Sequence, residues 1–207
     1  PLSVILANNS ILRENPEARV GSLSRWTDST QQAAKRMQQL IGEMLTLADV
    51  ERPEAPLELT QVDIASVVMK AALELESVAY EQGVALDTEL PGSLPGRSSE
   101  NYLQRIAASL MENAIKYEPR GGHVLVTLTR SRRHAILEVH NRSTRISQED
   151  LPHVFDRFYR SDKSRQSKTG GHGLGLAITK EMVTKLGGTV QAGSGEDGTT
   201  FSVKLPL

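Results

Sequence analysis

The sequence predicts an α+β protein in which an antiparallel helical hairpin precedes a two-layer sandwich of helices and strands. Three observations carry this prediction: a heptad repeat through residues 23–50, a charged break containing two prolines at residues 51–56, and a long segment beyond it that alternates helical and β-rich stretches. A length of 207 residues suits one large or two small domains. We therefore predict a hairpin domain at 1–51, a linker at 52–56 and a second domain at 57–207.

The hairpin prediction rests on two uninterrupted segments. Residues 2–15 contain no glycine or proline, and Pro16 and Gly21 then mark a connection. Apolar or small residues next recur at alternating spacings of three and four: Leu23, Trp26, Thr30, Ala33, Met37, Leu40, Met44 and Leu47, with Ala34, Ile41, Leu45 and Ala48 widening the stripe. A hairpin cannot bury such a stripe alone, so we predict a homodimeric four-helix bundle. The alternative is that the helix packs on the rest of the chain.

The first half of the second domain alternates in type. We expect a short strand at residues 57–60, a helix that Asp63 caps and Gly83 ends, and a strand at 84–90. A turn-rich loop at 91–96 then leads to a helix that begins after Ser99 and reaches Tyr117.

The second half begins with a β-hairpin, formed by residues 124–129 and 135–141. Residues 147–150 read as a capping box before a short helix, and residues 160–171 as a mobile polar loop. A helix at 174–186, closed by Gly187 and Gly188, precedes two final strands at 189–192 and 200–205.

Composition excludes several function classes. With 24 basic and 25 acidic residues the formal charge is −1, which argues against a nucleic-acid-binding protein. The absence of cysteine excludes disulfides, thiolate metal sites and cysteine nucleophiles. No apolar run approaches the roughly 18 residues needed to cross a bilayer. Because the chain opens with Pro1 and Leu2, we interpret it as part of a longer protein.

Three segments could carry chemistry. Gly170 to Leu176 is glycine-rich and opens a helix, an arrangement that lets backbone N–H groups approach a phosphate. A dinucleotide-binding fingerprint would need glycine at Leu176, and a flexible loop remains the alternative. Residues 112–117 place Asn113 and Lys116 on one helix face, where an amide oxygen can ligate Mg²⁺ and a lysine can neutralise phosphate. Residues 155–160 lead into a basic loop that suits a polyphosphate.

Together, in this order and spacing, these segments resemble the catalytic half of bacterial two-component sensor histidine kinases, whose ATP-binding domain is shared with DNA gyrase and a heat-shock chaperone. Residues 109–117 match the asparagine box, 155–160 the phenylalanine box, and 171–176 the second glycine box. Residues 198–201 resemble the closing strand motif, and the helical hairpin resembles the dimerisation and phosphotransfer domain. The resemblance implies a two-layer α/β sandwich with a mixed sheet.

The resemblance also implies site residues for ATP and Mg²⁺. Asn113 would ligate Mg²⁺, Lys116 would contact phosphate, and Tyr117 would line the nucleotide pocket. Arg160 and Arg165 would approach the phosphates from a lid at 160–171. The full implied set is Asn113, Lys116, Tyr117, Asn141, Phe158, Arg160, Arg165, Gly171, His172, Gly173, Leu174, Gly175, Leu176 and Thr200.

Departures from the family pattern bear on activity. None of the five histidines matches the phosphate acceptor, so we predict that this chain cannot phosphorylate itself on histidine. The first glycine box, expected as Asp-x-Gly-x-Gly, reads Asn141 to Arg145, and Asn141 would accept from the adenine amino group through its amide oxygen. Ser109 replaces a second metal-facing asparagine.

The implied function is the transmitter part of a sensor histidine kinase at the cytoplasmic face of the membrane, anchored through an upstream segment. It would bind Mg-ATP, act as a homodimer, phosphorylate a histidine and relay the phosphoryl group to the receiver domain of a response regulator. The alternative is a non-catalytic or phosphatase-biased dimeric module that binds ATP weakly because the first glycine box is degraded.

Overall fold

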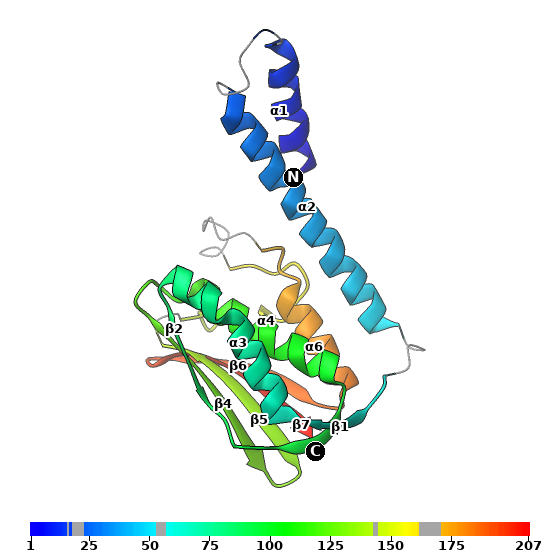
Figure 1. The fold of residues 1–207 in the computed structure, drawn as a ribbon, viewed down its shortest axis with the longest axis vertical. Coiled ribbons are helices and arrows are strands. Elements are labelled where there is room, and N and C mark those ends of the chain that lie inside the picture. The colour runs from blue at the N-terminus through cyan, green and yellow to red at the C-terminus, as the bar shows by residue number, and fades with distance from the viewer. Residues whose placement is uncertain (16, 18–22, 53–56, 143–144, 162–170) are drawn as a thin grey trace. The chain divides into compact units, whose positions relative to one another are not determined.

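The computed structural model describes residues 1–15, 17, 23–52, 57–142, 145–161 and 171–207 (Figure 1). These residues form two compact units, Pro1–Ala48 and Asp49–Leu207. Most of the linker predicted at 52–56 lies outside the described residues, so the predicted domain limits stay a prediction.

The first unit holds helix α1, Leu2–Glu14, and most of α2, Ser24–Glu51. Both predicted helices are confirmed, and Figure 1 shows them side by side in opposite directions. The main heptad row of α2 is buried or half-buried except at Met44. The residues that widen the stripe are exposed: Ala34, Ile41, Leu45 and Ala48. One apolar row of α2 is therefore largely covered, whereas the second row is exposed.

The second unit is a two-layer sandwich, as predicted. Its main sheet has the strand order β2-β4-β5-β7-β6, formed by Ala85–Glu89, His123–Ser131, His134–Asn141, Gly198–Pro206 and Thr189–Gly195. Strand β2 runs parallel to β4 and the other pairs are antiparallel, so the sheet is mixed. Helices α3, Ile64–Gln82, α4, Glu100–Tyr117, and α6, Gly175–Lys185, cover one face of it (Figure 1). A short helix, η2, spans Leu151–His153.

The caps predicted for the first helix of this unit are confirmed. The Asp63 carboxylate accepts hydrogen bonds from the N–H groups of Ala65 and Leu94, at 3.1 and 2.8 Å. Gly83 ends the helix in the left-handed conformation, with φ of 69°. Asp63 thereby fixes both the start of α3 and the segment that precedes β3.

One predicted strand was wrong in position, and one strand was missed. Strand β1 lies at Thr60–Asp63 rather than 57–60, and β3, Pro95–Ser98, occupies the end of the predicted turn-rich loop. The two strands pair with each other, Val62 opposite Gly96. A Cβ at Gly96 would meet the Ile64 side chain at 2.9 Å, so this glycine serves close packing rather than a turn.

The core lies between the sheet and the helices. Val124, Val126, Val139 and Val203 from the sheet, and Leu110 from α4, are all fully buried. Burying each such side chain contributes about 1.5–3 kcal/mol, so the sheet and α4 hold each other in place. Among the described residues, no helix combines the length and the hydropathy needed to cross a membrane.

Candidate functional site

Helix α4 presents three predicted site residues at its C-terminal end. Its apolar side chains form a buried stripe that includes Leu110, Met111 and Ala114. Asn113, Lys116 and Tyr117 lie beside this stripe and are half-buried. The helix therefore positions an amide, an ammonium group and a phenol at one edge of the core.

Lys116 lies against the start of the glycine-rich segment. A Cβ built on Gly171 would be 2.5 Å from the Lys116 Nζ atom, so a larger residue at 171 would displace the ammonium group. The same Nζ atom lies 5.2 Å from the centre of the Tyr117 ring. The structure thus brings the asparagine box and the second glycine box together through Lys116.

Gly173 joins the glycine-rich segment to the phenylalanine box. The Phe158 N–H donates to the Gly173 carbonyl at 2.9 Å, and Gly173 has φ of 73°. A Cβ on Gly173 would be 2.6 Å from the Tyr159 carbonyl oxygen. Phe158 itself has φ of 62° and an exposed side chain. Glycine is required at 173 for two reasons, the backbone conformation and the close approach.

The start of α6 lies beside α4. Leu174 is fully buried and anchors this end of the helix, whereas Gly175 is exposed and Leu176 half-buried. The Thr179 hydroxyl lies 2.9 Å from the Ser109 Oγ atom and donates to the Gly175 carbonyl at 3.0 Å. Ser109 therefore faces the first turn of α6, where N–H groups without helical partners favour anions.

Asn141 ends β5 beneath the last turns of α4. Its side chain is buried, and its Nδ2 atom donates to the Ala114 carbonyl at 2.7 Å. Thr199 pairs with Asn141 across the strands and is also buried. Sequence reasoning missed Thr199, although strand alternation from the apolar Phe201 could have identified it.

Two predicted residues stand apart from this group. The Thr200 side chain lies on the open face of the sheet, where its hydroxyl is 2.9 Å from His140 Nδ1. The structure therefore does not bring Thr200 to the other site residues, because alternate strand residues point to opposite faces. Arg165 lies outside the described residues.

Other predicted positions flank the glycine-rich segment. Arg160 precedes this segment in sequence and His172 lies within it, and both residues are half-buried. The chain after Asn141 is held by Arg145, which donates to the Glu196 carbonyl at 2.7 Å, and by the Ile146 N–H, which donates to Ser194 Oγ at 2.9 Å. A side chain thus anchors position 145, where the family pattern has a glycine.

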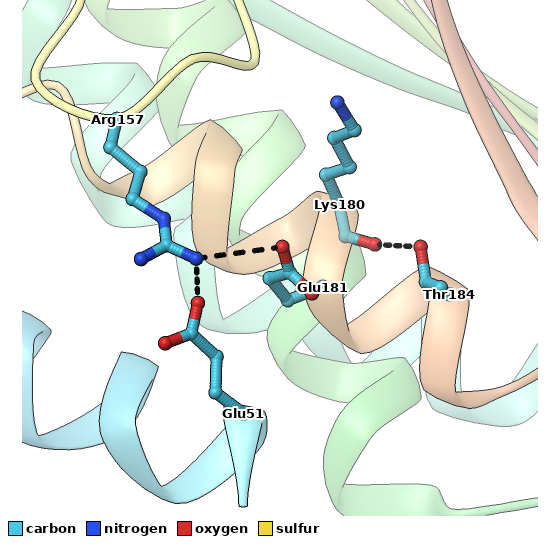
Figure 2. Close-up of polar contacts among 5 residues, drawn as sticks. All are labelled: Glu51, Arg157, Lys180, Glu181 and Thr184. Atoms are coloured by element: carbon cyan, nitrogen blue, oxygen red, sulfur yellow. Dashed lines mark hydrogen bonds and ion pairs between the residues drawn. The ribbon is translucent and has the colours of Figure 1, made fainter.

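Arg157, also in the phenylalanine box, is engaged by carboxylates. Figure 2 shows its guanidinium between Glu51 and Glu181, the latter at 3.9 Å. The Lys185 ammonium group donates to the Arg52 carbonyl nearby at 2.7 Å. With two acidic partners, Arg157 is a poorer candidate for phosphate binding than Lys116.

The assembled group offers cationic, amide and hydroxyl contacts beside a helix N-terminus. Within the described ranges, no three His, Cys, Asp or Glu side chains form a cluster that could hold a metal. The arrangement suits an anionic ligand whose own oxygens would contribute to binding a cation.

Comparison with known families decides the identity of this fold. The profile of the histidine kinase-, DNA gyrase B- and HSP90-like ATPase family matches residues 98–207, which is more than half of the chain. The chain belongs to this family. The match covers α4, the glycine-rich segment and the strands that frame them, so the resemblance stated above is confirmed.

Curated relatives of this chain include sensor kinases. The sensor-like histidine kinase SenX3 of Mycobacterium tuberculosis is 34% identical over 89% of this chain and 45% of its own length. The sensor protein VanS of Enterococcus faecium is 30% identical over 100% of this chain and 53% of its own length. The chain thus spans about half the length of these relatives.

Solved structures share the fold. The Acinetobacter baumannii histidine kinase AdeS superposes with a TM-score of 0.80 at 20% identity, covering 100% of this chain and 95% of that one. ShkA in complex with AMPPNP gives 0.76 at 22% identity, over 98% of this chain and 42% of that one. ThkA in complex with the response regulator protein TrrA gives 0.78 at 16% identity, over 98% and 57%. The helical hairpin and the sandwich therefore recur together in kinases.

Proposed function

We propose that this chain binds Mg-ATP and forms the ATP-binding kinase module of a two-component sensor histidine kinase. The observation that carries the proposal is the position of the Lys116 ammonium group against Gly171, which joins two boxes of the ATPase family at one point. The names of the curated relatives and the AMPPNP complex of ShkA support it.

The residues divide into three roles. Lys116 and Arg160, together with the N–H groups from Gly171 to Gly175, would bind the phosphates. Asn141 and Tyr117 would contact the nucleoside. The Asn113 amide oxygen would hold Mg²⁺, which usually binds one or two protein oxygens plus substrate phosphates, so the donor present fits the ion.

The reaction is an in-line phosphoryl transfer. A histidine nitrogen would attack the γ-phosphorus, the bond from that phosphorus to the β,γ-bridging oxygen would break, and ADP would leave. Bound Mg²⁺ would neutralise charge that develops on the phosphate oxygens. The chain's own contribution is to position the triphosphate and to neutralise charge through Lys116.

The acceptor histidine is not among the five histidines of this sequence. We therefore expect this fragment to bind ATP without phosphorylating itself on histidine. Incubation with radiolabelled ATP should give no acid-labile phosphoprotein, and the appearance of such a product would contradict the assignment.

Two partners follow from the proposed function. The exposed second row of α2 fits a second copy of this chain, as the heptad repeat predicts. A response regulator would receive the phosphoryl group, and the ThkA complex with TrrA shows such a partner for a protein of the same fold.

Calorimetric titration with AMPPNP, with and without Mg²⁺, tests the proposal. We expect micromolar binding that Mg²⁺ strengthens, and loss of the Mg²⁺-dependent part in Asn113→Ala. Asn101→Ala, on the exposed first turn of α4, is the matched control and should bind as wild type does. No binding of wild type at millimolar AMPPNP would contradict the proposal and favour the non-catalytic module.

A further inference from the structure

The buried amide of Asn141 makes a contact that the expected aspartate could not make. Its Nδ2 atom donates to the Ala114 carbonyl at 2.7 Å, and the residue is 2% exposed. A carboxylate has no hydrogen to donate. At the same position it would set a negatively charged oxygen against a carbonyl oxygen, away from water.

The Ala114 carbonyl lies in the last turn of α4. It also accepts from the Glu118 N–H at 3.0 Å, the bond that closes the helix. Carbonyls at a helix C-terminus carry partial negative charge, so this is an unfavourable place for an anion and a favourable one for an N–H donor. Asn141 therefore satisfies the helix end from the neighbouring strand.

The strand end that carries Asn141 has little freedom to move. A Cβ on Gly198 would lie 1.9 Å from the Asn141 carbonyl oxygen, so β7 lies tightly against this point. Val124 pairs with Asn141 on the other side, from β4. The amide thus links a fixed position in the sheet to the helical turn that carries Asn113 and Lys116.

From this geometry we propose that Asn141 is a positioning residue for nucleotide binding in this chain. Its amide ties β5 to the last turn of α4 and so holds Asn113 and Lys116 at the phosphates. Restoring the family's aspartate would weaken nucleotide binding rather than strengthen it. The inference rests on the proposed function and adds a second role to the base contact proposed for Asn141.

The test compares the Kd values of wild type, Asn141→Asp and Asn141→Ala for AMPPNP and for tripolyphosphate, each with Mg²⁺. Tripolyphosphate has no base, so it reports only on the groups that bind phosphate. We expect both variants to bind both ligands about tenfold more weakly, the loss that corresponds to one hydrogen bond near the top of its range. Asn101→Asp makes the same chemical change on an exposed turn of α4 and should alter neither Kd.

Hydrogen exchange provides a readout that does not need a ligand. The amide of Glu118 donates to the carbonyl that Asn141 holds, so it should exchange faster in both variants while the amides of β4 remain protected. If wild type binds no nucleotide but the Glu118 amide exchanges faster in the variants, the proposed function fails. The structural link between Asn141 and the last turn of α4 is then still supported.

Two results would overturn the inference. One is Asn141→Asp binding AMPPNP as tightly as wild type or more tightly, which would make the residue a base acceptor alone. The other is a variant that weakens AMPPNP binding while tripolyphosphate binding and Glu118 exchange stay unchanged. Asn141→Ala adds no charge, so it keeps the comparison usable if the aspartate variant fails to fold.

Discussion

Gly173 combines two demands on one residue at the centre of the candidate site. Its φ of 73° disfavours a side chain, and a Cβ would clash with the backbone of Phe158 and Tyr159. Gly173→Ala should lower the free energy of unfolding by about 2–3 kcal/mol, since left-handed strain and a forced backbone shift add. Urea denaturation measures this loss.

The matched control for Gly173 is Gly193 on β6. No atom lies within 4 Å of the position its Cβ would take, and its φ is outside the left-handed region. Gly193→Ala should therefore leave the unfolding free energy unchanged or slightly raised. Equal effects of the two substitutions would mean that the segment around Gly173 adjusts freely.

At the scale of single residues, the sequence identified site residues that share a helix or a loop. It failed where the face of a strand determines whether a residue reaches the site. Asn113, Lys116 and Tyr117 lie within five residues of one another on α4, so a single motif identifies all three. Thr199 and Thr200 are adjacent in a motif but lie on opposite faces of β7, and the pairing of β7 with β5 sets Thr199 beside Asn141. The Asn141 contact with Ala114 joins residues 27 apart and leaves no trace in a local pattern.

Among the elements, α3 depends on one carboxylate. Hydrogen bonds from the Leu94 N–H and from the Ser93 hydroxyl lower the pKa of Asp63, with smaller contributions from Ser66 and Ala65. A carboxyl group with a lowered folded-state pKa stabilises the protein above its unfolded value, 3.8, and loses this contribution as the pH falls through the folded-state value.

Asp63→Asn should therefore unfold at lower urea than wild type at pH 7, and the difference should shrink as the pH falls below 3.8. Ser93→Ala removes one of the hydrogen bonds and should give a smaller change in the same direction. The measurement is the urea midpoint of each variant at pH 7 and at pH 3. A difference that stays constant with pH would show that the carboxylate's charge does not matter.

The elements with local signals were predicted well, and those without them were not. Asp63 marks the start of α3 and Gly83 marks its end. Both were predictable because a cap and a left-handed glycine act within a few residues of the helix end. Strand β3 was read as a turn because Pro95 and Gly96 are typical of turns, and only pairing with β1 makes them extended. Tertiary contacts override local preference at that strand.

For the whole molecule, self-association is the property with the largest physical consequence. The hairpin leaves apolar side chains exposed on both helices, among them Leu6 at 63%, Ile41 at 52% and Leu45 at 62%. An isolated hairpin gains no stability from these exposed side chains. A second copy would remove them from water, and each side chain would contribute about 1.5–3 kcal/mol when fully buried. We expect a dimer at micromolar concentration, with twice the chain mass of 22.6 kDa by light scattering.

Leu45→Glu should shift that dimer toward monomer, because a carboxylate in the second apolar row of α2 would lose hydration in the dimer without gaining a partner. Leu73 on α3 is 56% exposed and lies in the other compact unit, which makes Leu73→Glu a matched control that should stay dimeric. Circular dichroism on both variants separates dissociation from unfolding. A wild-type monomer, or a monomer produced equally by Leu73→Glu, would show that the second apolar row of α2 is not the association surface.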